Sequence, residues 1–276
     1  MLAVRDVPRG EAAASALRER TGNAAIDVVE LDLASLSSVR GAAEELLAIG
    51  AEEAPLRAIV ANAGLQVLST AHASEDGYEL TFAVNHLGHF LLVRLLQEAL
   101  VAPARVLAVS SGTHYGTLRQ SWGFPAPRWA DPHELARPRE GSGRVAYATS
   151  KLANLYFTYE LARRSDPERL AANAFDPGLM PATGLARDAS AFQRFMWDRV
   201  LPPLRHVVPG ISSTAASGAA LARLAVDPAL HGVSGRYYAI TRDTLSSEAS
   251  YDGARAEELW AVSEELVGLD TAVRSG

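Results

Sequence analysis

Tyr147 and Lys151 are the residues of this chain whose types and spacing most directly indicate chemistry. Four positions apart on a helix, they share one face, so the ammonium can lie beside the phenol. A nearby ammonium can lower the pKa of a tyrosine from about 10 towards neutrality, which would make the phenol a ready proton donor and acceptor. A solvated surface pair has the same spacing, so the pair alone leaves both interpretations open.

Lys151 is also the single lysine among 26 basic residues, all the others being arginines. Lysine is a compact point charge with three donors, which suits a small pocket where a planar guanidinium does not fit. One lysine kept against this bias favours a functional site without establishing it.

Further polar residues follow apolar runs that we predict as buried strands. Residues 62–64 (Asn-Ala-Gly) follow one such run, Ser110 and Ser111 follow the next, and residues 176–178 (Asp-Pro-Gly) follow a third. Open α/β sheets bind ligands at the carboxyl ends of their strands. Each of these turns is weak evidence alone. Their order along the chain and their common position at strand ends, together with the Tyr/Lys pair, predict one shared site.

The chain alternates short apolar runs with helical patterns, which is typical of βαβ units and a parallel sheet. The predicted strands are residues 1–4, 26–31, 57–61, 105–109, 170–175 and 235–240, and the predicted helices are 11–20, 35–47, 78–99, 145–164, 214–224 and 254–266. Asn85 lies inside the long helix 78–99, where its side chain must face something other than its own backbone.

The amino-acid composition argues against several classes of function. The net charge is −6 and no basic stripe is present, so we expect no nucleic-acid partner. No cysteine is present, which excludes disulfides, thiolate metal sites and a cysteine nucleophile. The most apolar stretch, residues 87–102, carries charged side chains and falls short of a membrane span. The first residues are too short and too charged for a signal peptide, so we expect a cytoplasmic protein.

With these motifs in order, the chain resembles the short-chain dehydrogenase/reductase family from residue 1 to about residue 268. Residues 84–90 and 150–154 look like its retinol dehydrogenase-like branch, and residues 177–185 are similar to protochlorophyllide reductases. The resemblance implies an α/β fold, a Rossmann-like doubly wound parallel sheet in three layers, formed by one domain over residues 1–276.

The resemblance also implies catalytic roles. Tyr147 would be the general acid that protonates a carbonyl oxygen, or the base in the reverse direction. Lys151 would stabilise the phenolate and bind the nicotinamide ribose, and Ser111 would hold the carbonyl oxygen. Ser111 is preferred to Ser110 because the second serine of the pair is the family's catalytic one. Asn85 would anchor a water that leads to Lys151.

The implied cofactor is NADP(H), favoured over NAD(H), because a basic residue after the second strand can meet the 2′-phosphate. That residue is Arg5, although Asp6 follows it immediately. The expected cofactor-binding residues are Arg5, Asp32, Leu33, Asn62, Ala63, Gly64, Tyr147, Lys151, Pro177, Gly178 and Thr183.

Residues 113–144 and 179–210 interrupt the strand–helix rhythm, and we interpret both as substrate-side loops or lids. The second contains an apolar cluster that plain core packing would also explain. We expect a small apolar carbonyl or alcohol substrate, and self-association as a homodimer or homotetramer. His86 and His89 have metal-pair spacing but no third ligand nearby, so no metal is expected. His114 is expected to be a solvated loop residue.

A Gly-rich phosphate-binding turn is missing from the sequence, whose first glycine is Gly10. Residues 1–6 resemble the family's second strand and the loop after it, so the first strand and first helix would be absent. We therefore expect strand 1–4 to lie beside a gap, pairing poorly with strand 57–61 or leaving a groove. A wrongly assigned start codon and a chain that has truly lost this segment would both explain the missing Gly-rich turn.

Three functions remain open at this stage. The first is a nicotinamide-dependent carbonyl reductase or alcohol dehydrogenase acting on an apolar substrate. The second is a non-catalytic remnant that binds a partner or only oligomerises. The third, a light-dependent reductase, is weaker, because such enzymes are associated with photosynthetic pigments and reactive cysteines, and this chain has none.

Overall fold

The computed structural model describes residues 1–52, 55–117, 120–121, 123–180 and 212–269. Its strands are β1 (Leu2–Val4), β2 (Val28–Glu30), β3 (Ala58–Ala61), β4 (Ala104–Val109), β5 (Leu170–Asp176), β6 (Tyr237–Ala239) and β7 (Arg242–Thr244). Its α-helices are α1 (Val7–Thr21), α2 (Leu36–Glu52), α3 (Leu80–Phe82), α4 (Gly88–Leu96), α5 (Pro132–Leu135), α6 (Gly143–Arg164), α9 (Thr214–Val226) and α10 (Gly253–Leu266). Short turns of other helix types complete it, at η1 (Ala83–Leu87), η2 (Gln97–Ala99), η3 (Gly112–Tyr115), η6 (Pro228–Leu230) and η7 (Glu248–Tyr251).

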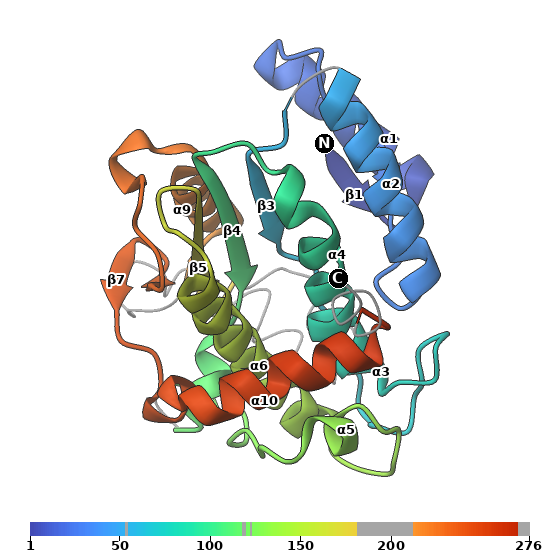
Figure 1. Ribbon diagram of the computed structural model, residues 1–276, viewed down its shortest axis with the longest axis vertical. Coiled ribbons are helices and arrows are strands. Elements are labelled where there is room, and N and C mark those ends of the chain that lie inside the picture. Colours follow the sequence, from blue (N-terminus) through green and yellow to red (C-terminus); the bar gives the residue numbers. More distant parts are fainter. Residues whose placement is uncertain (53–54, 118–119, 122, 181–211, 270–276) are drawn as a thin grey trace, which may run out of the picture.

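The strands form two sheets (Figure 1). The larger has the order β3-β4-β5-β6-β7, in which the first four strands run parallel and β7 runs antiparallel to β6. The smaller contains β1 and β2, also parallel. Within the described residues no strand pairing joins β1 to β3, as the expected gap requires. The predicted doubly wound α/β fold is confirmed, whereas β7 and α5 were not predicted.

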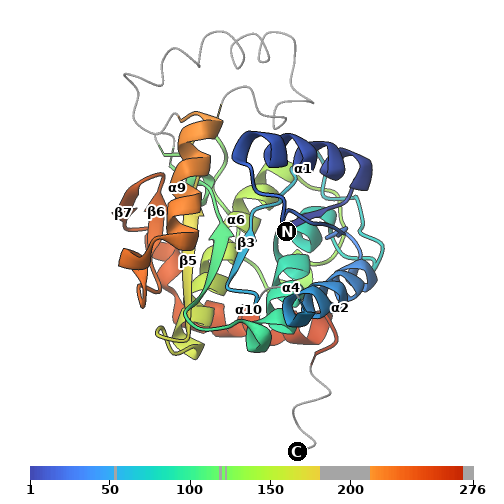
Figure 2. The same ribbon diagram turned by 90° about the horizontal axis from the view of Figure 1, so that it is seen from above.

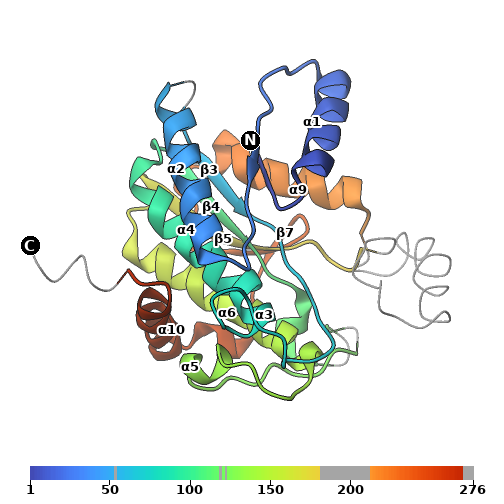
Figure 3. The ribbon, with the colours of Figure 1, turned by 90° about the vertical axis from the view of Figure 1, so that its right-hand side faces the viewer.

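Helices cover both faces of the larger sheet (Figures 2 and 3). Helices α4 and α6 lie on one face, with α10 packed over α6 and α2 against α4, whereas α9 and α1 lie on the other side. Every residue of β4 and β5 is buried, which is typical of central parallel strands with helices on both faces. Val106 and Ala108 belong to the main core, and Leu107 and Val109 to the cluster under α9.

The predicted helix 78–99 is one continuous helical segment with an irregular turn inside it. It runs from α3 through η1, a π-helical turn, into α4 and η2. Glu79 caps its start by accepting from the amides of Thr81 and Phe82. Single π-turns inside α-helices are frequent at functional sites, and this one contains Asn85.

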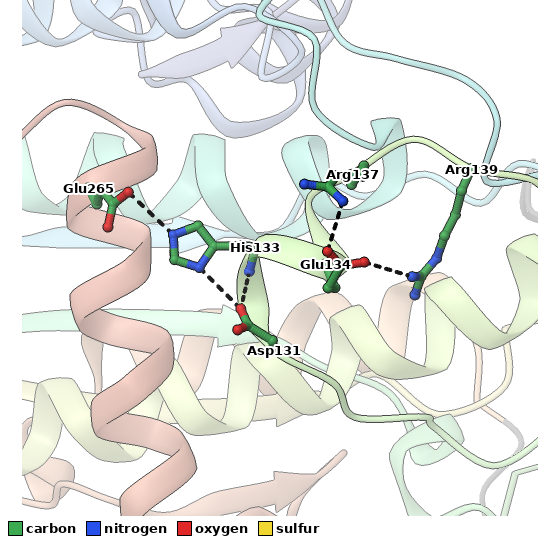
Figure 4. Close-up of polar contacts among 6 residues, drawn as sticks. All are labelled: Asp131, His133, Glu134, Arg137, Arg139 and Glu265. Carbon is green, nitrogen blue, oxygen red and sulfur yellow. Dashed lines mark hydrogen bonds and ion pairs between the residues drawn. The ribbon is translucent and has the colours of Figure 1, made fainter.

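Helix α5 lies within the segment 113–144 and is fastened to α10 (Figure 4). His133 is hydrogen-bonded to Glu265 of α10 over 3.3 Å and to Asp131 over 3.1 Å. These two bonds, with Glu265 the stronger influence, raise the pKa of His133. Glu134 forms ion pairs with Arg137 and Arg139 on the other side of the same turn. This part of the segment is therefore packed against the C-terminal helix.

Candidate active site

Tyr147 lies in the second turn of α6, with 7% of its surface exposed. The side chain of Ser111, at the carboxyl end of β4, lies beside its hydroxyl. The pKa of Tyr147 is raised to about 12, first by burial and then by the negative charge of Asp176, while the Ser111 hydroxyl opposes both. At neutral pH the phenol is therefore protonated, and it is a weaker acid than a free tyrosine.

Lys151 is one helical turn further along α6 and is almost fully buried. Its Nζ donates to the carbonyl of Val109 over 3.0 Å and lies 5.5 Å from the centroid of the Tyr147 ring. Burial lowers the pKa of Lys151 to about 8, against the opposing effect of Asp176. The predicted pairing of the two side chains is thus present, but the predicted lowering of the tyrosine pKa is wrong for this structure, because burial dominates.

The two serines after β4 have different partners. The hydroxyl of Ser110 donates to the backbone carbonyl of Lys151 over 2.8 Å, which fixes β4 against α6. Ser111 instead faces Tyr147 and caps η3 by accepting from the amide of Thr113. The geometry therefore agrees with the preference for Ser111 as the residue that contacts the reacting oxygen.

Asn85 connects the π-turn with two other parts of the site. Its amide donates to the hydroxyl of Ser150 over 2.9 Å and to the carbonyl of Leu65 over 3.0 Å, and its oxygen accepts from the amide of Leu65 over 2.8 Å. With all three bonds made, Asn85 holds the loop after β3 against α6. Its expected role as a water anchor remains a prediction.

The loops after β3 and β5 complete this edge of the sheet. Asn62, Ala63 and Gly64 are exposed, and a Cβ on Gly64 would lie 3.3 Å from both Lys151 Nζ and Asn85 Oδ1. Pro177 and Gly178 follow β5, where Gly178 has a left-handed φ of 73°. The structure thus places the strand-end motifs beside Asn85, Ser111, Tyr147 and Lys151.

The remaining predicted cofactor residues lie elsewhere or outside the described residues. Arg5 is exposed between β1 and α1, and Asp6 beside it caps α1 by accepting from the amide of Arg9. Asp32 is half-buried and accepts from the amide of Ala34. Leu33 is a core residue. Thr183 and nearly all of the predicted lid 179–210 lie outside the described residues.

His114 corrects one expectation. It was expected to be solvated, but it is 1% exposed, and its Nδ1 donates to the carbonyl of Ser111 over 2.5 Å. Its Nε2 accepts from the amide of Ser247 over 3.1 Å. Burial lowers the pKa of His114 to about 4, although the bond to Ser111 opposes this. His114 is therefore a neutral residue that supports the serine loop.

His86 and His89 both have hydrogen-bond partners. His86 Nε2 is bonded to the hydroxyl of Ser263 over 2.8 Å, and His89 Nδ1 to the carbonyl of Asn85 over 3.2 Å. Burial lowers the pKa of His86 to about 3 and that of His89 to about 4. Both act as packed, neutral side chains behind the π-turn.

The residues present fit the nicotinamide and ribose end of a dinucleotide. The narrow space above Gly64, the partly free ammonium of Lys151 and the exposed backbone of residues 62–64 suit a polar sugar. For the phosphate end of the dinucleotide, the described residues show no comparable fit. The turn between β1 and α1 contains no glycine, and Gly10 serves packing, because a Cβ there would lie 2.5 Å from a methyl of Val4.

Asp176 and Tyr237 are site residues that sequence reasoning missed. Asp176 had been read only as part of a turn, yet it is buried and influences the pKa of both Tyr147 and Lys151. Tyr237 donates its hydroxyl to Asp176 over 3.0 Å. The available signal was a carboxylate directly after an apolar strand, which is unusual among buried residues.

In the part of the chain that the structure describes, no helix is both long and apolar enough to cross a bilayer.

Comparisons with known proteins give consistent matches. Residues 1–121 match the family model described as short chain dehydrogenase, and residues 183–273 match an AcuH dehydrogenase domain. The chain is 37% identical to a WW domain-containing oxidoreductase of Danio rerio over 97% of its own length, and it spans 62% of that relative. It is 36% identical to retinol dehydrogenase 12 of Mus musculus, covering 97% of this chain and 78% of the relative.

Solved structures agree. A crystal structure of an uncharacterized protein from Mycobacterium paratuberculosis has a TM-score of 0.59 and 30% identity, covering 96% of this chain and 82% of the other. A gluconate 5-dehydrogenase from Burkholderia cenocepacia in complex with NADP and tartrate has a TM-score of 0.58 and 21% identity, with coverages of 86% and 82%. The second likeness supports the fold alone.

Proposed function

Because the chain belongs to the short-chain dehydrogenase family of oxidoreductases, we propose that it reduces an apolar carbonyl compound, or oxidises the matching alcohol, with a nicotinamide cofactor. The observation that carries the proposal is the buried phenol of Tyr147, which lies beside Ser111 and one helical turn from Lys151. This arrangement supplies an acid, an oxygen-holding hydroxyl and a positive charge at one strand edge.

The cofactor, when bound, supplies the hydride. The hydroxyl of Tyr147 donates its proton to the carbonyl oxygen as that oxygen gains negative charge. Ser111 donates a hydrogen bond to the same oxygen and shares its developing charge. Lys151 stabilises the phenolate left on Tyr147, and Asn85 keeps the loop after β3 in place beside both. The raised pKa of Tyr147 keeps the phenol protonated at neutral pH, which is the form that reduction requires.

The substrate class and cofactor preference are part of the proposal. Relatives named retinol dehydrogenase support a long apolar aldehyde or alcohol. NADP(H) is favoured because Arg5 is exposed, whereas the carboxylate of Asp6 is engaged as a helix cap. In an Arg5→Ala variant we expect a higher KM for NADPH and little change for NADH.

The direct test is hydride transfer, followed as consumption of NADPH with retinaldehyde and a series of straight-chain aldehydes. Tyr147→Phe should reduce kcat by at least about 100-fold, because the proton donor is removed while the ring remains. The matched control is Tyr159→Phe in the same helix, whose hydroxyl is bonded to Ser246 instead. Equal activity in the two variants would exclude Tyr147 as the acid.

A non-catalytic function is the second candidate. It is favoured by the edge of β3 that faces away from β4, which pairs with no strand among the described residues. Titration calorimetry of the 276-residue chain with NADPH separates the two candidates. Absence of binding, together with absence of turnover, would favour the binding or oligomerising function.

A further inference from the structure

Asp176 ends β5 as a buried carboxylate that accepts two hydrogen bonds. The amide of Gly178 donates to it over 2.9 Å, and the hydroxyl of Tyr237 on β6 donates over 3.0 Å. Gly112, at the start of η3 after β4, lies close to it, and its amide lowers the pKa of Asp176. The side chain therefore lies where the ends of β4, β5 and β6 meet, and its donors stabilise its ionised form.

The close approach of Gly112 shows how tightly this carboxylate is enclosed. A Cβ at Gly112 would lie 3.4 Å from Asp176 Oδ2 and 2.7 Å from the carbonyl of Gln120. Asp176 is 9% exposed. A charge held this far from water is costly unless another charge and several hydrogen bonds compensate it.

Lys151 provides part of that compensation. Its Nζ donates to the carbonyl of Val109, which is the register partner of Phe175, the residue directly before Asp176. Ser110, directly after β4, donates its amide to the Phe175 carbonyl over 2.8 Å. The ammonium and the carboxylate therefore lie at the same strand ends. Asp176 accordingly raises the pKa of Lys151, and Lys151 lowers that of Asp176, although burial has the larger effect on each.

The other titratable groups facing Asp176 carry no charge at neutral pH. They are Tyr147 on α6, Tyr115 on η3 and Tyr237 on β6, each with a pKa raised by burial and by Asp176. His114 packs against Tyr237 with the ring centroids 5.1 Å apart and is neutral. Lys151 is thus the cation of this group, within the part of the chain that the structure describes.

We propose that Asp176 is a positioning residue of this site, acting as the buried counter-charge of Lys151 and disfavouring the phenolate of Tyr147. Together with burial, its carboxylate keeps the phenol protonated, so that reduction starts from the acid form and the phenolate needed for alcohol oxidation forms only at higher pH. This consequence for turnover rests on the proposed function, whereas the charge pairing itself does not.

The test uses the fact that Lys151 is the only lysine in the sequence. Protein labelled with ¹³C and ¹⁵N in lysine gives a single side-chain NMR signal, so Lys151 can be titrated without assignment. In Asp176→Asn we expect the pKa of Lys151 to fall by about one unit, because a nearby negative charge is lost. In the same variant, the pH at which alcohol oxidation becomes half-maximal should shift downward, because the phenolate of Tyr147 forms more easily.

Tyr237→Phe is the matched control, since it removes a donor to Asp176 but keeps the charge. If Asp176 had only a structural role, Asp176→Asn and Tyr237→Phe would give similar results and the pKa of Lys151 would not change. That outcome would overturn the proposal. If Asp176→Asn does not fold, the wild-type lysine signal should still show a second inflection at acid pH as Asp176 is protonated. Absence of that inflection would also overturn it. A shifted lysine pKa in a protein without turnover would contradict the proposed function alone.

Discussion

Asn85 donates a hydrogen bond to Ser150 over 2.9 Å, although the two residues stand 65 positions apart. The bond joins the π-turn η1 to α6 directly before Lys151. The same Asn85 side chain holds both the amide and the carbonyl of Leu65. A single amide therefore sets the spacing between the loop after β3 and the helix that contains the proposed acid.

Asn85→Ala is expected to lower the free energy of unfolding by about 1–3 kcal/mol, because buried polar groups lose their partners. The KM for cofactor should rise in parallel, since residues 62–64 lose their support. Urea denaturation and steady-state kinetics measure the two effects. Asn23→Ala, which removes an exposed turn contact to Ala25, should change stability by less than about 0.5 kcal/mol. Equal effects of the two substitutions would refute the proposed role of Asn85.

Substitution of Ser111 should mainly affect kcat, whereas substitution of Ser110 should mainly affect stability. In Ser111→Ala we expect kcat to fall by about 100- to 1000-fold, because the developing negative charge loses a donor. In Ser110→Ala, stability should fall by about 0.5–1.5 kcal/mol through loss of the bond to the Lys151 carbonyl. Its effect on kcat should be much smaller. A larger loss of kcat in the Ser110 variant would reverse the assignment.

Gly143, the first residue of α6, allows the close approach of the segment at Val67. A Cβ there would lie 1.8 Å from the Val67 carbonyl oxygen, so Gly143→Ala should destabilise the protein by at least about 1–3 kcal/mol. Gly218 in α9 has no atom within 4 Å of its Cβ position, and Gly218→Ala should stabilise by about 0.4–1 kcal/mol. Thermal denaturation distinguishes these opposite signs, and a neutral Gly143→Ala would show that α6 can shift freely.

Buried histidines should make the protein sensitive to acid. The pKa of His86 is lowered from 6.5 to about 3 by burial, so below pH 6.5 the unfolded chain binds a proton that the native chain does not. Stability is therefore fully present above pH 6.5 and is lost as the pH falls towards 3. The loss reaches about 1.4 kcal/mol per pH unit for one histidine. His86→Gln should lose stability less steeply between pH 6 and 4 in urea titrations, because this interval lies between the native pKa of about 3 and the unfolded value of 6.5.

The surface residue His231 is the control for this prediction. Its side chain is 45% exposed, so His231→Gln measures the effect of the same substitution at a surface site. An identical slope in wild-type protein and His86→Gln would mean that His86 gains a proton in the native state.

The sequence predicted the parts of the site that depend on local pattern. Helical spacing placed Tyr147 and Lys151 together, and strand ends placed Ser111 and residues 62–64 near them. Asp176 was missed because its partner Tyr237 is 61 positions away. His114 was misjudged for the same reason, since the amide of Ser247 that satisfies it is 133 positions distant. The π-turn adds a residue to one helical turn, which periodicity over the whole helix does not reveal.

The strands were predicted more accurately than their pairing. Buried apolar runs identified β4 and β5, because both faces of such strands are covered. The apolar run at β3 also forms a strand, but the prediction that it is buried was wrong, since only Ala61 of β3 is buried. The exposed strand β7, with residues Arg242–Thr244, has no apolar signal and was missed. Helix α5 is a single turn whose position depends on His133 and Glu265, from distant parts of the sequence.

The separate β1–β2 sheet has a consequence for how the molecule opens. It contacts the remaining structure through α2, which packs on α4, and through Leu33, whose carbonyl lies 2.8 Å from the Cβ position of Gly88. No ladder bond ties β1 to β3 within the described residues. In amide hydrogen exchange, β1 and β2 should therefore open as a cooperative unit of their own, at lower free energy than β4 and β5.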